Sequence, residues 1–152
     1  MKQHAFLQVA APAVAVGEVL ADLGTYPHWN DLVQAAVPAD SSEAIAAWTT
    51  TLRAQVGPLA RSKQLRFVKT VDETDSEGGD RRIRFERREL DGREHAEWVM
   101  EATVQAGDSH STDVTLDLTY SGGLWMPALG NVLGGAMERA TARLSTYVNA
   151  QS

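Results

Sequence analysis

The sequence predicts a single domain of the α+β class, in which a curved antiparallel sheet packs against one long helix. The clearest observation is an amphipathic segment over residues 124–150, whose apolar side chains recur at spacings of three and four. Before it, most of the chain alternates between apolar and polar residues, which is typical of half-buried strands. The 152 residues are enough to bury one core. Because a lone amphipathic helix must bury its apolar stripe, the sheet is its natural partner.

The N-terminal part is expected to form one strand and two short helices. Residues 4–11 alternate loosely and predict the first strand. Residues 13–23 have helical spacing, and Gly24 is suited to end that helix. A second short helix is expected to begin at Pro27, because proline is favoured in the first turn of a helix.

Six further strands are predicted before the long helix. Gly57-Pro58 separates the third strand of the chain from the fourth, and Asp91-Gly92 is predicted to form a two-residue hairpin between the fifth and the sixth. Hairpin connections of this kind imply an antiparallel sheet. The six strands are expected over residues 33–37, 44–56, 60–71, 81–90, 94–106 and 112–120.

Composition excludes several classes of protein. A net charge of −6 and a pI of about 5.1 argue against general nucleic-acid binding. The absence of cysteine excludes disulfides and thiolate chemistry, and the four histidines have no metal-ligand spacing, so neither a metal nor a cofactor is expected. The sequence has no apolar run long enough to span a membrane and no signal-peptide core at its start, so a cytoplasmic location is expected.

Several short motifs carry a resemblance to a known family. Residues 25–32 read Thr-Tyr-Pro-His-Trp-Asn-Asp-Leu, and Tyr120-x-Gly122-Gly123-Leu124-Trp125 leads into the long helix. Val56-Gly57-Pro58 and Phe85-Glu86-Arg87 add to the pattern. Together with the order of elements, these motifs resemble the START-like superfamily, also called SRPBCC, which includes the birch-pollen allergen fold and the polyketide cyclase/dehydrase and lipid-transport group. The resemblance implies a helix-grip fold, in which a seven-stranded sheet wraps the C-terminal helix and leaves a deep, mainly apolar cavity.

That cavity is expected to bind an apolar or amphipathic small molecule, such as a lipid, a polyketide or an aromatic metabolite. Affinity would come from desolvation of apolar surface, and a few polar groups, Thr50, Tyr26 and Arg87, would orient the ligand. Trp29 either lines the wall or anchors the short helices beneath the long one. A monomer or a homodimer is expected. The expected ligand-binding residues are Trp29, Trp48, Thr50, Phe67, Phe85, Arg87, Trp98, Met100, Tyr120, Trp125, Leu129, Leu133 and Met137.

The alternative function is an enzyme of the polyketide cyclase, aromatase or dehydrase type that uses the same cavity. Its acid or base would be Tyr26 or His28, and of the four histidines His28 lies nearest the expected cavity mouth. In aromatase/cyclase relatives the third strand tends to present an aromatic, a hydroxyl and a cationic residue to the pocket. Here the third position is Leu52, and alternation turns Arg53 outward, which weakens this reading unless the register shifts by one residue. A third reading is a stress or assembly protein with a collapsed cavity.

Two features remain open between a structural and a functional role. Arg87 has the parity of inward-facing residues, so it needs either a carboxylate partner or a ligand anion, unless it reaches solvent at the strand end. Gly130, Gly134 and Gly135 are unusual inside a helix. They either let the helix lie close to the strands or leave room for a bulky ligand.

Overall fold

The computed structural model describes residues 2–40, 45–75, 79–108, 110–121 and 129–151 of the chain. It contains seven antiparallel strands in the order β1-β7-β6-β5-β4-β3-β2, so β1 and β2 are the two edges. The predicted fold class, a sheet with two short helices after the first strand and a long C-terminal helix, is therefore confirmed. In chain order the elements are β1 (Lys2–Val9), α1 (Ala13–Ala21), the 3-10 helix η1 (Leu23–His28), β2 (Val33–Ala39), β3 (Ala47–Val56), β4 (Leu59–Thr74), β5 (Arg81–Arg87), β6 (Trp98–Ala106), β7 (Thr112–Tyr120) and α2 (Leu129–Ala150).

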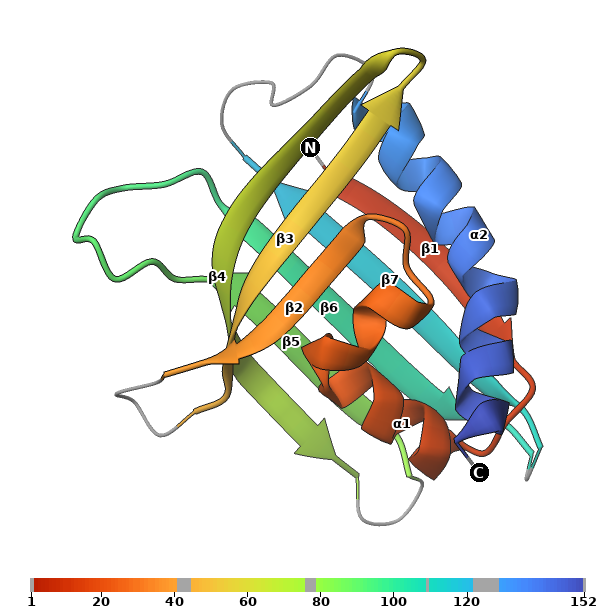
Figure 1. Cartoon of the computed structure of the whole chain (residues 1–152). Coiled ribbons are helices and arrows are strands. Elements are labelled where there is room, and N and C mark those ends of the chain that lie inside the picture. Colours follow the sequence, from red (N-terminus) through yellow and green to blue (C-terminus); the bar gives the residue numbers. More distant parts are fainter. Residues whose placement is uncertain (1, 41–44, 76–78, 109, 122–128, 152) are drawn as a thin grey trace.

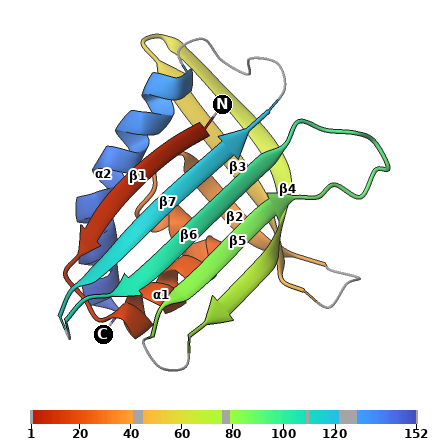
Figure 2. The ribbon, with the colours of Figure 1, turned by 180° about the vertical axis from the view of Figure 1, so that it is seen from behind.

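The sheet curls around the helices, and all the helices among the described residues lie on one side of it. Figure 1 shows α1, η1 and α2 on the concave side, with α2 running beside β1. The view from behind shows the convex face, where the strands lie in front of all the helices (Figure 2). A sheet that is covered on one face explains the alternation of apolar and polar residues in the sequence.

Side-chain alternation sorts each strand between the two faces. On β7 the apolar side chains are buried and the intervening Thr115, Asp117 and Thr119 are half-buried. On β3 the side chains of Trp48, Thr50, Leu52 and Ala54 are buried while Arg53 is exposed. The register expected for the third strand is thus confirmed, and Arg53 faces outward.

The loop between β5 and β6 differs from the predicted two-residue hairpin. β5 ends at Arg87 and β6 begins only at Trp98, although Gly92 does have a positive φ of 70°. Two carboxylates of this loop accept hydrogen bonds from backbone N–H groups, one on β4 and one within the loop itself. The Glu89 carboxylate accepts a hydrogen bond from the backbone N–H of Arg66 at 3.1 Å, and the Asp91 carboxylate accepts one from the backbone N–H of Arg93 at 3.0 Å.

The short helices also begin and end differently from the prediction. Asp22, not Gly24, caps the C-terminus of α1, and η1 already begins at Leu23 rather than at Pro27. The reason is local, because the Asp22 carboxylate accepts a hydrogen bond from the backbone N–H of Gly24 at 2.9 Å and so starts the new turn.

The long helix carries the expected apolar stripe over its described part. Ala136, Met137, Ala140, Leu144 and Val148 are buried. The expected start at residue 124 cannot be compared, because residues 122–128 lie outside the described residues. α2 is described from Leu129 onward.

Two of the three glycines of α2, Gly134 and Gly135, are not required for close packing against the described residues. A Cβ added at Gly134 would meet, among those residues, the Gln3 side-chain oxygen at 3.9 Å, and one added at Gly135 would meet the flexible Arg139 side chain at 3.2 Å. At these two positions the geometry favours spare room over a close helix–strand approach, and the surroundings of Gly130 lie outside the described part of the structure.

Gly134→Ala should therefore stabilise the protein. Alanine inside a helix is favoured over glycine by about 1 kcal/mol, and the added methyl group has space. Thermal unfolding followed by circular dichroism should show a higher Tm by roughly 2–4 °C. Ala142→Gly at an exposed position of the same helix is the matched control and should lower the Tm by a similar amount. A lower Tm for Gly134→Ala would contradict this account of the helix.

Candidate functional site

The candidate site lies between the concave face of the sheet, α2, and the loop that follows η1. A small space, here called the inner cavity, has a volume of about 40 Å³. A more open depression, here called the outer groove, has a volume of about 250 Å³ and runs between β3, α2 and the same loop. Leu32 and Ala136 line both spaces. The inner cavity is also lined by Met100, Leu116, Leu118 and Met137.

The inner cavity is much smaller than a ligand site. One water molecule takes roughly 30 Å³ of liquid volume, whereas pockets for small molecules typically measure about 300–1,000 Å³. The described residues therefore enclose far less space than the deep cavity that the resemblance implies.

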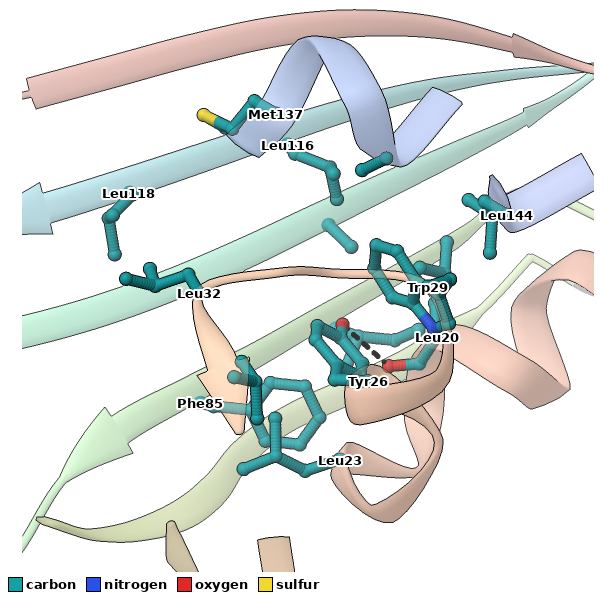
Figure 3. Packing of buried hydrophobic residues seen from close by; sticks show 14 of the residues in the cluster. Leu20, Leu23, Tyr26, Trp29, Leu32, Phe85, Leu116, Leu118, Met137 and Leu144 are labelled. Atoms are coloured by element: carbon teal, nitrogen blue, oxygen red, sulfur yellow. Dashed lines mark hydrogen bonds between the residues drawn. The ribbon is translucent and has the colours of Figure 1, made fainter. Parts of the chain in front are cut away.

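Leu32 occupies the boundary between the two spaces. Figure 3 shows it pointing from the loop toward Leu118 of β7, with Met137 of α2 near Leu116. The loop is shaped by Asn30, whose side-chain oxygen accepts a hydrogen bond from the backbone N–H of Leu32 at 3.0 Å. This local turn holds the Leu32 side chain inward, where it is 6% exposed.

Charged side chains fasten the loop to α2 across the outer groove. The Asp31 carboxylate accepts a hydrogen bond from Arg139 Nε at 2.7 Å and one from Arg143 Nη1. Arg143 also donates to the backbone carbonyl of His28 at 3.3 Å. The hydrogen bond from Arg139 and the nearby charge of Arg143 hold the pKa of Asp31 below its ordinary value, against the opposite effect of partial burial.

Aromatic side chains from four neighbouring strands and from the end of β7 lie among the aliphatic side chains of the concave face. Trp48 lies opposite Phe67 in the β3–β4 pairing and makes an edge-on contact with Phe85 at 5.4 Å between ring centroids. Trp98 lies opposite Tyr120, with a centroid distance of 4.6 Å. The structure thus gathers these predicted residues on one face. Their role in binding stays a prediction.

Thr50 is a polar group without a partner on this face. Its side chain is fully buried between Trp48 and Leu52 along β3. No described residue forms a hydrogen bond with the Thr50 Oγ1 atom. An unsatisfied buried hydroxyl costs about 1–3 kcal/mol, so a ligand that bonded to it would recover that free energy.

The two acid/base candidates are placed differently from the rest. The Tyr26 hydroxyl donates a hydrogen bond to the backbone carbonyl of Leu20 at 3.0 Å, and burial together with the charge of Asp22 raises the pKa of Tyr26 far above its ordinary value (Figure 3). His28 is exposed and stacks on Tyr147 of α2 with a centroid distance of 5.1 Å. The Tyr26 hydroxyl is therefore engaged by α1, and the His28 ring is engaged by α2.

Trp29 is completely buried and lies next to Tyr26, with ring centroids 4.4 Å apart. Its indole N–H donates to the Thr25 hydroxyl at 3.3 Å. These contacts account for a structural role of Trp29 within the 25–32 motif.

Three other expected wall residues cannot be assigned. Trp125 lies outside the described residues. Leu129 and Leu133 are within α2, but their side chains lie outside the described part of the structure.

The prediction from sequence missed Asp31, Leu32 and Arg139 as residues of the groove, and Lys63 as a residue of the concave face. Lys63 lies opposite the buried Leu52 in the β3–β4 pairing. Its parity with Leu65 and Phe67 could have indicated this position. No spacing in the sequence indicates the pairing of Asp31 with Arg139.

None of the helices in the described parts of the chain combines the length and the hydropathy that a membrane crossing requires. Within the same residues, no group of three or more His, Asp or Glu side chains is arranged to hold a metal ion.

Comparison with known proteins places the chain among START-like proteins. Residues 4–149 match the family model described as "Polyketide cyclase / dehydrase and lipid transport". No curated protein sequence gives a significant match.

Solved structures share the fold at low sequence identity. A START superfamily protein from Mycobacterium smegmatis is 17% identical, with a TM-score of 0.68 and 99% of each chain covered. Human StAR-related lipid transfer protein 5 is 12% identical, with a TM-score of 0.79, over 99% of this chain and 76% of that one. The Zhui aromatase/cyclase from a Streptomyces species is 16% identical, with a TM-score of 0.58, over 99% of this chain and 92% of that one. These likenesses show a shared helix-grip fold.

Asp31→Asn should loosen the loop from α2 with little change in global stability. The ion pairs are partly exposed, so the free energy of unfolding should fall by less than about 1 kcal/mol. Amide hydrogen exchange of residues 30–33 should become several-fold faster. Glu138→Gln, an exposed carboxylate of α2, is the matched control and should leave this exchange unchanged.

The same variant should also change the pH dependence of the loop. Because the pKa of Asp31 is lowered by folding, its contribution is present above the ordinary value of 3.8 and is lost as the pH falls through the lowered pKa. The wild type and Asp31→Asn should therefore converge in acid. A difference between them that persists undiminished in acid would contradict the ion-pair account.

Proposed function

The chain belongs to the family of polyketide cyclases, dehydrases and lipid-transport proteins, and on that premise we propose that it binds an apolar or amphipathic small molecule against the concave face of its sheet. The observation that carries this proposal is the unpaired Thr50 hydroxyl, fully buried on an apolar face that includes Trp48 and Phe67. Such a face supplies affinity by desolvation, and one fixed hydroxyl supplies orientation.

The size of the inner cavity implies that binding is coupled to opening. The outer groove and the inner cavity share Leu32 and Ala136, so an outward movement of Leu32 joins them into one space. The movement has to overcome the Asp31 ion pairs, which are partly exposed and therefore weak. A ligand that binds the open state more tightly than the closed state shifts the equilibrium toward opening. Lipids, polyketides and aromatic metabolites all fit this description.

Binding takes precedence over catalysis in this proposal because neither acid/base candidate is available to the concave face. The Tyr26 hydroxyl is bonded to the Leu20 carbonyl, and the His28 ring stacks on the outward-facing side of α2. Arg53, the cation that a cyclase would require on β3, is exposed and has the opposite parity to Thr50 and Leu52, so it lines the outer groove and not the concave face. On the concave face itself, none of these three groups supplies an acid, a base or a cation.

Thr50→Val tests the role of the buried hydroxyl, because the two side chains have nearly the same shape. In the free protein the change should leave stability unchanged or increase it, since it removes an unsatisfied polar group. Affinity for a neutral hydroxylated probe, 2-naphthol, should fall by about tenfold, as loss of one hydrogen bond predicts. Quenching of tryptophan fluorescence measures binding, because Trp48 and Trp98 lie on the same face.

Thr115→Val is the matched control, since Thr115 faces away from the buried side of β7. It should leave the affinity for 2-naphthol unchanged. Equal affinities of the wild type and Thr50→Val would contradict the assigned role of Thr50. Failure of the wild type to bind 2-naphthol, decan-1-ol and co-purified cell lipids alike, measured by fluorescence and native mass spectrometry, would contradict the proposed function itself.

A further inference from the structure

The concave face carries charged side chains as well as aromatic ones. Lys63 of β4 lies directly opposite Leu52, and Arg87 of β5 lies directly opposite Phe67. Residues that are directly opposite in an antiparallel pair project from the same face of the sheet. Because Leu52 and Phe67 are completely buried, both cations project from the apolar face.

Arg87 is nearly buried and already has a carboxylate partner. Its side chain is 9% exposed, and its Nε donates a hydrogen bond to Glu89 Oε1 at 3.0 Å. Its Nη1 donates to the backbone carbonyl of Ala96 at 3.3 Å. A guanidinium group has five N–H donors, so these two bonds leave donors available to a further acceptor.

The Glu89 carboxylate is shared between two donors, and Lys63 has no ion-pair partner among the described residues. The same Glu89 oxygen that binds Arg87 also accepts the backbone N–H of Arg66 at 3.1 Å. No hydrogen bond or ion pair joins the half-buried Lys63 ammonium to another described residue. Burial and the nearby charge of Arg87 lower the pKa of Lys63, while Glu89 acts in the opposite direction. Lys63, Arg87 and Glu89, here called the charged cluster, thus interact and carry one excess positive charge.

A partly desolvated cation without a counter-charge is costly, and an anion from a ligand would offset that cost.

We propose that the ligand of the concave face is an apolar molecule that ends in a carboxylate, and that this carboxylate binds between Lys63 and Arg87. The inference rests on the proposed function, because it assigns a head group to the ligand whose apolar body covers the aromatic side chains. Lys63 supplies the uncompensated charge, and Arg87 supplies further N–H donors from a position fixed by Glu89 and Ala96.

Paired probes that differ only in the head group test this inference on the full chain. Isothermal titration calorimetry at neutral pH compares decanoate with decan-1-ol, and 2-naphthoate with 2-naphthalenemethanol. Each carboxylate should bind about tenfold more tightly than its alcohol, as expected for a charge-assisted hydrogen bond. Equal affinities within both pairs would overturn the carboxylate inference and leave the binding function standing. No binding of any of the four would overturn both.

Two variants should change the preference in opposite directions. Lys63→Met should weaken decanoate binding by about tenfold and leave decan-1-ol binding unchanged, because it removes the uncompensated charge. Glu89→Gln should tighten decanoate binding, because it removes the competing carboxylate while the Gln side-chain oxygen can still accept the Arg66 amide. Arg87 is left unchanged, since its removal would strand Glu89 without its partner.

Arg82→Gln is the control for general electrostatics. Arg82 is exposed and pairs with Glu101 at 3.1 Å. Along β5 it alternates with the buried Ile83 and Phe85, so it projects from the opposite face of the sheet to Arg87. The Arg82→Gln variant loses one positive charge, as Lys63→Met does, and should leave the ratio of decanoate to decan-1-ol affinity unchanged. An equal fall in that ratio for Lys63→Met and Arg82→Gln, or weaker decanoate binding by Glu89→Gln, would overturn the assignment.

Discussion

The need to cover the concave face of a strongly curved sheet governs this structure. That face carries the buried side chains of Trp48, Phe67, Phe85 and Trp98, which cannot be left in water without a large loss of stability. The chain covers them with two separate parts: the short helices α1 and η1 together with Trp29, which directly follows η1, and the long helix α2 (Figure 1). Because the two covers come from opposite ends of the chain, a seam is left between them. The outer groove and the inner cavity both lie along that seam.

The two covers differ in how firmly they are held. Around Trp29 the contacts are internal: Tyr26 bonds to the Leu20 carbonyl, and the Trp29 indole bonds to Thr25. Across the seam the polar contacts are the partly exposed ion pairs of Asp31 with Arg139 and Arg143. Exposed ion pairs contribute little to stability, so the seam is the natural place for the fold to open. In the proposed function, this difference lets one small domain combine a closely packed core with a face that opens to a ligand.

Strict periodicity explains which parts of this fold could be predicted from sequence. β7 has the predicted bounds, Thr112–Tyr120, because its apolar and polar residues alternate without interruption. The two-residue hairpin at Asp91-Gly92 was predicted wrongly, because β5 ends at Arg87 and β6 begins only at Trp98. Beyond Arg87 the Glu89 carboxylate bonds to the backbone N–H of Arg66 on β4, and no periodicity encodes that contact. The pairing of Asp31 with Arg139 spans 108 residues and depends on the final packing of α2.

The site itself was predictable only in part. Alternation placed Trp48 and Thr50 on the buried face of β3, but it could not give the volume of the space in front of them. That volume depends on how closely Leu32 and Met137 approach the sheet, which is a property of the packed chain. Lys63 had the parity of a buried residue and was overlooked, because lysine is usually solvated.

The central claim is that an apolar ligand enters the seam between the two covers and lies against the concave face. Intermolecular nuclear Overhauser effects between decan-1-ol and a protein with labelled methyl groups test it most directly. The account predicts contacts from the ligand chain to the methyl groups of Met100, Leu116 and Met137, which line the inner cavity. Contacts confined to exposed side chains such as Val14 and Leu90, with none to these three, would contradict it.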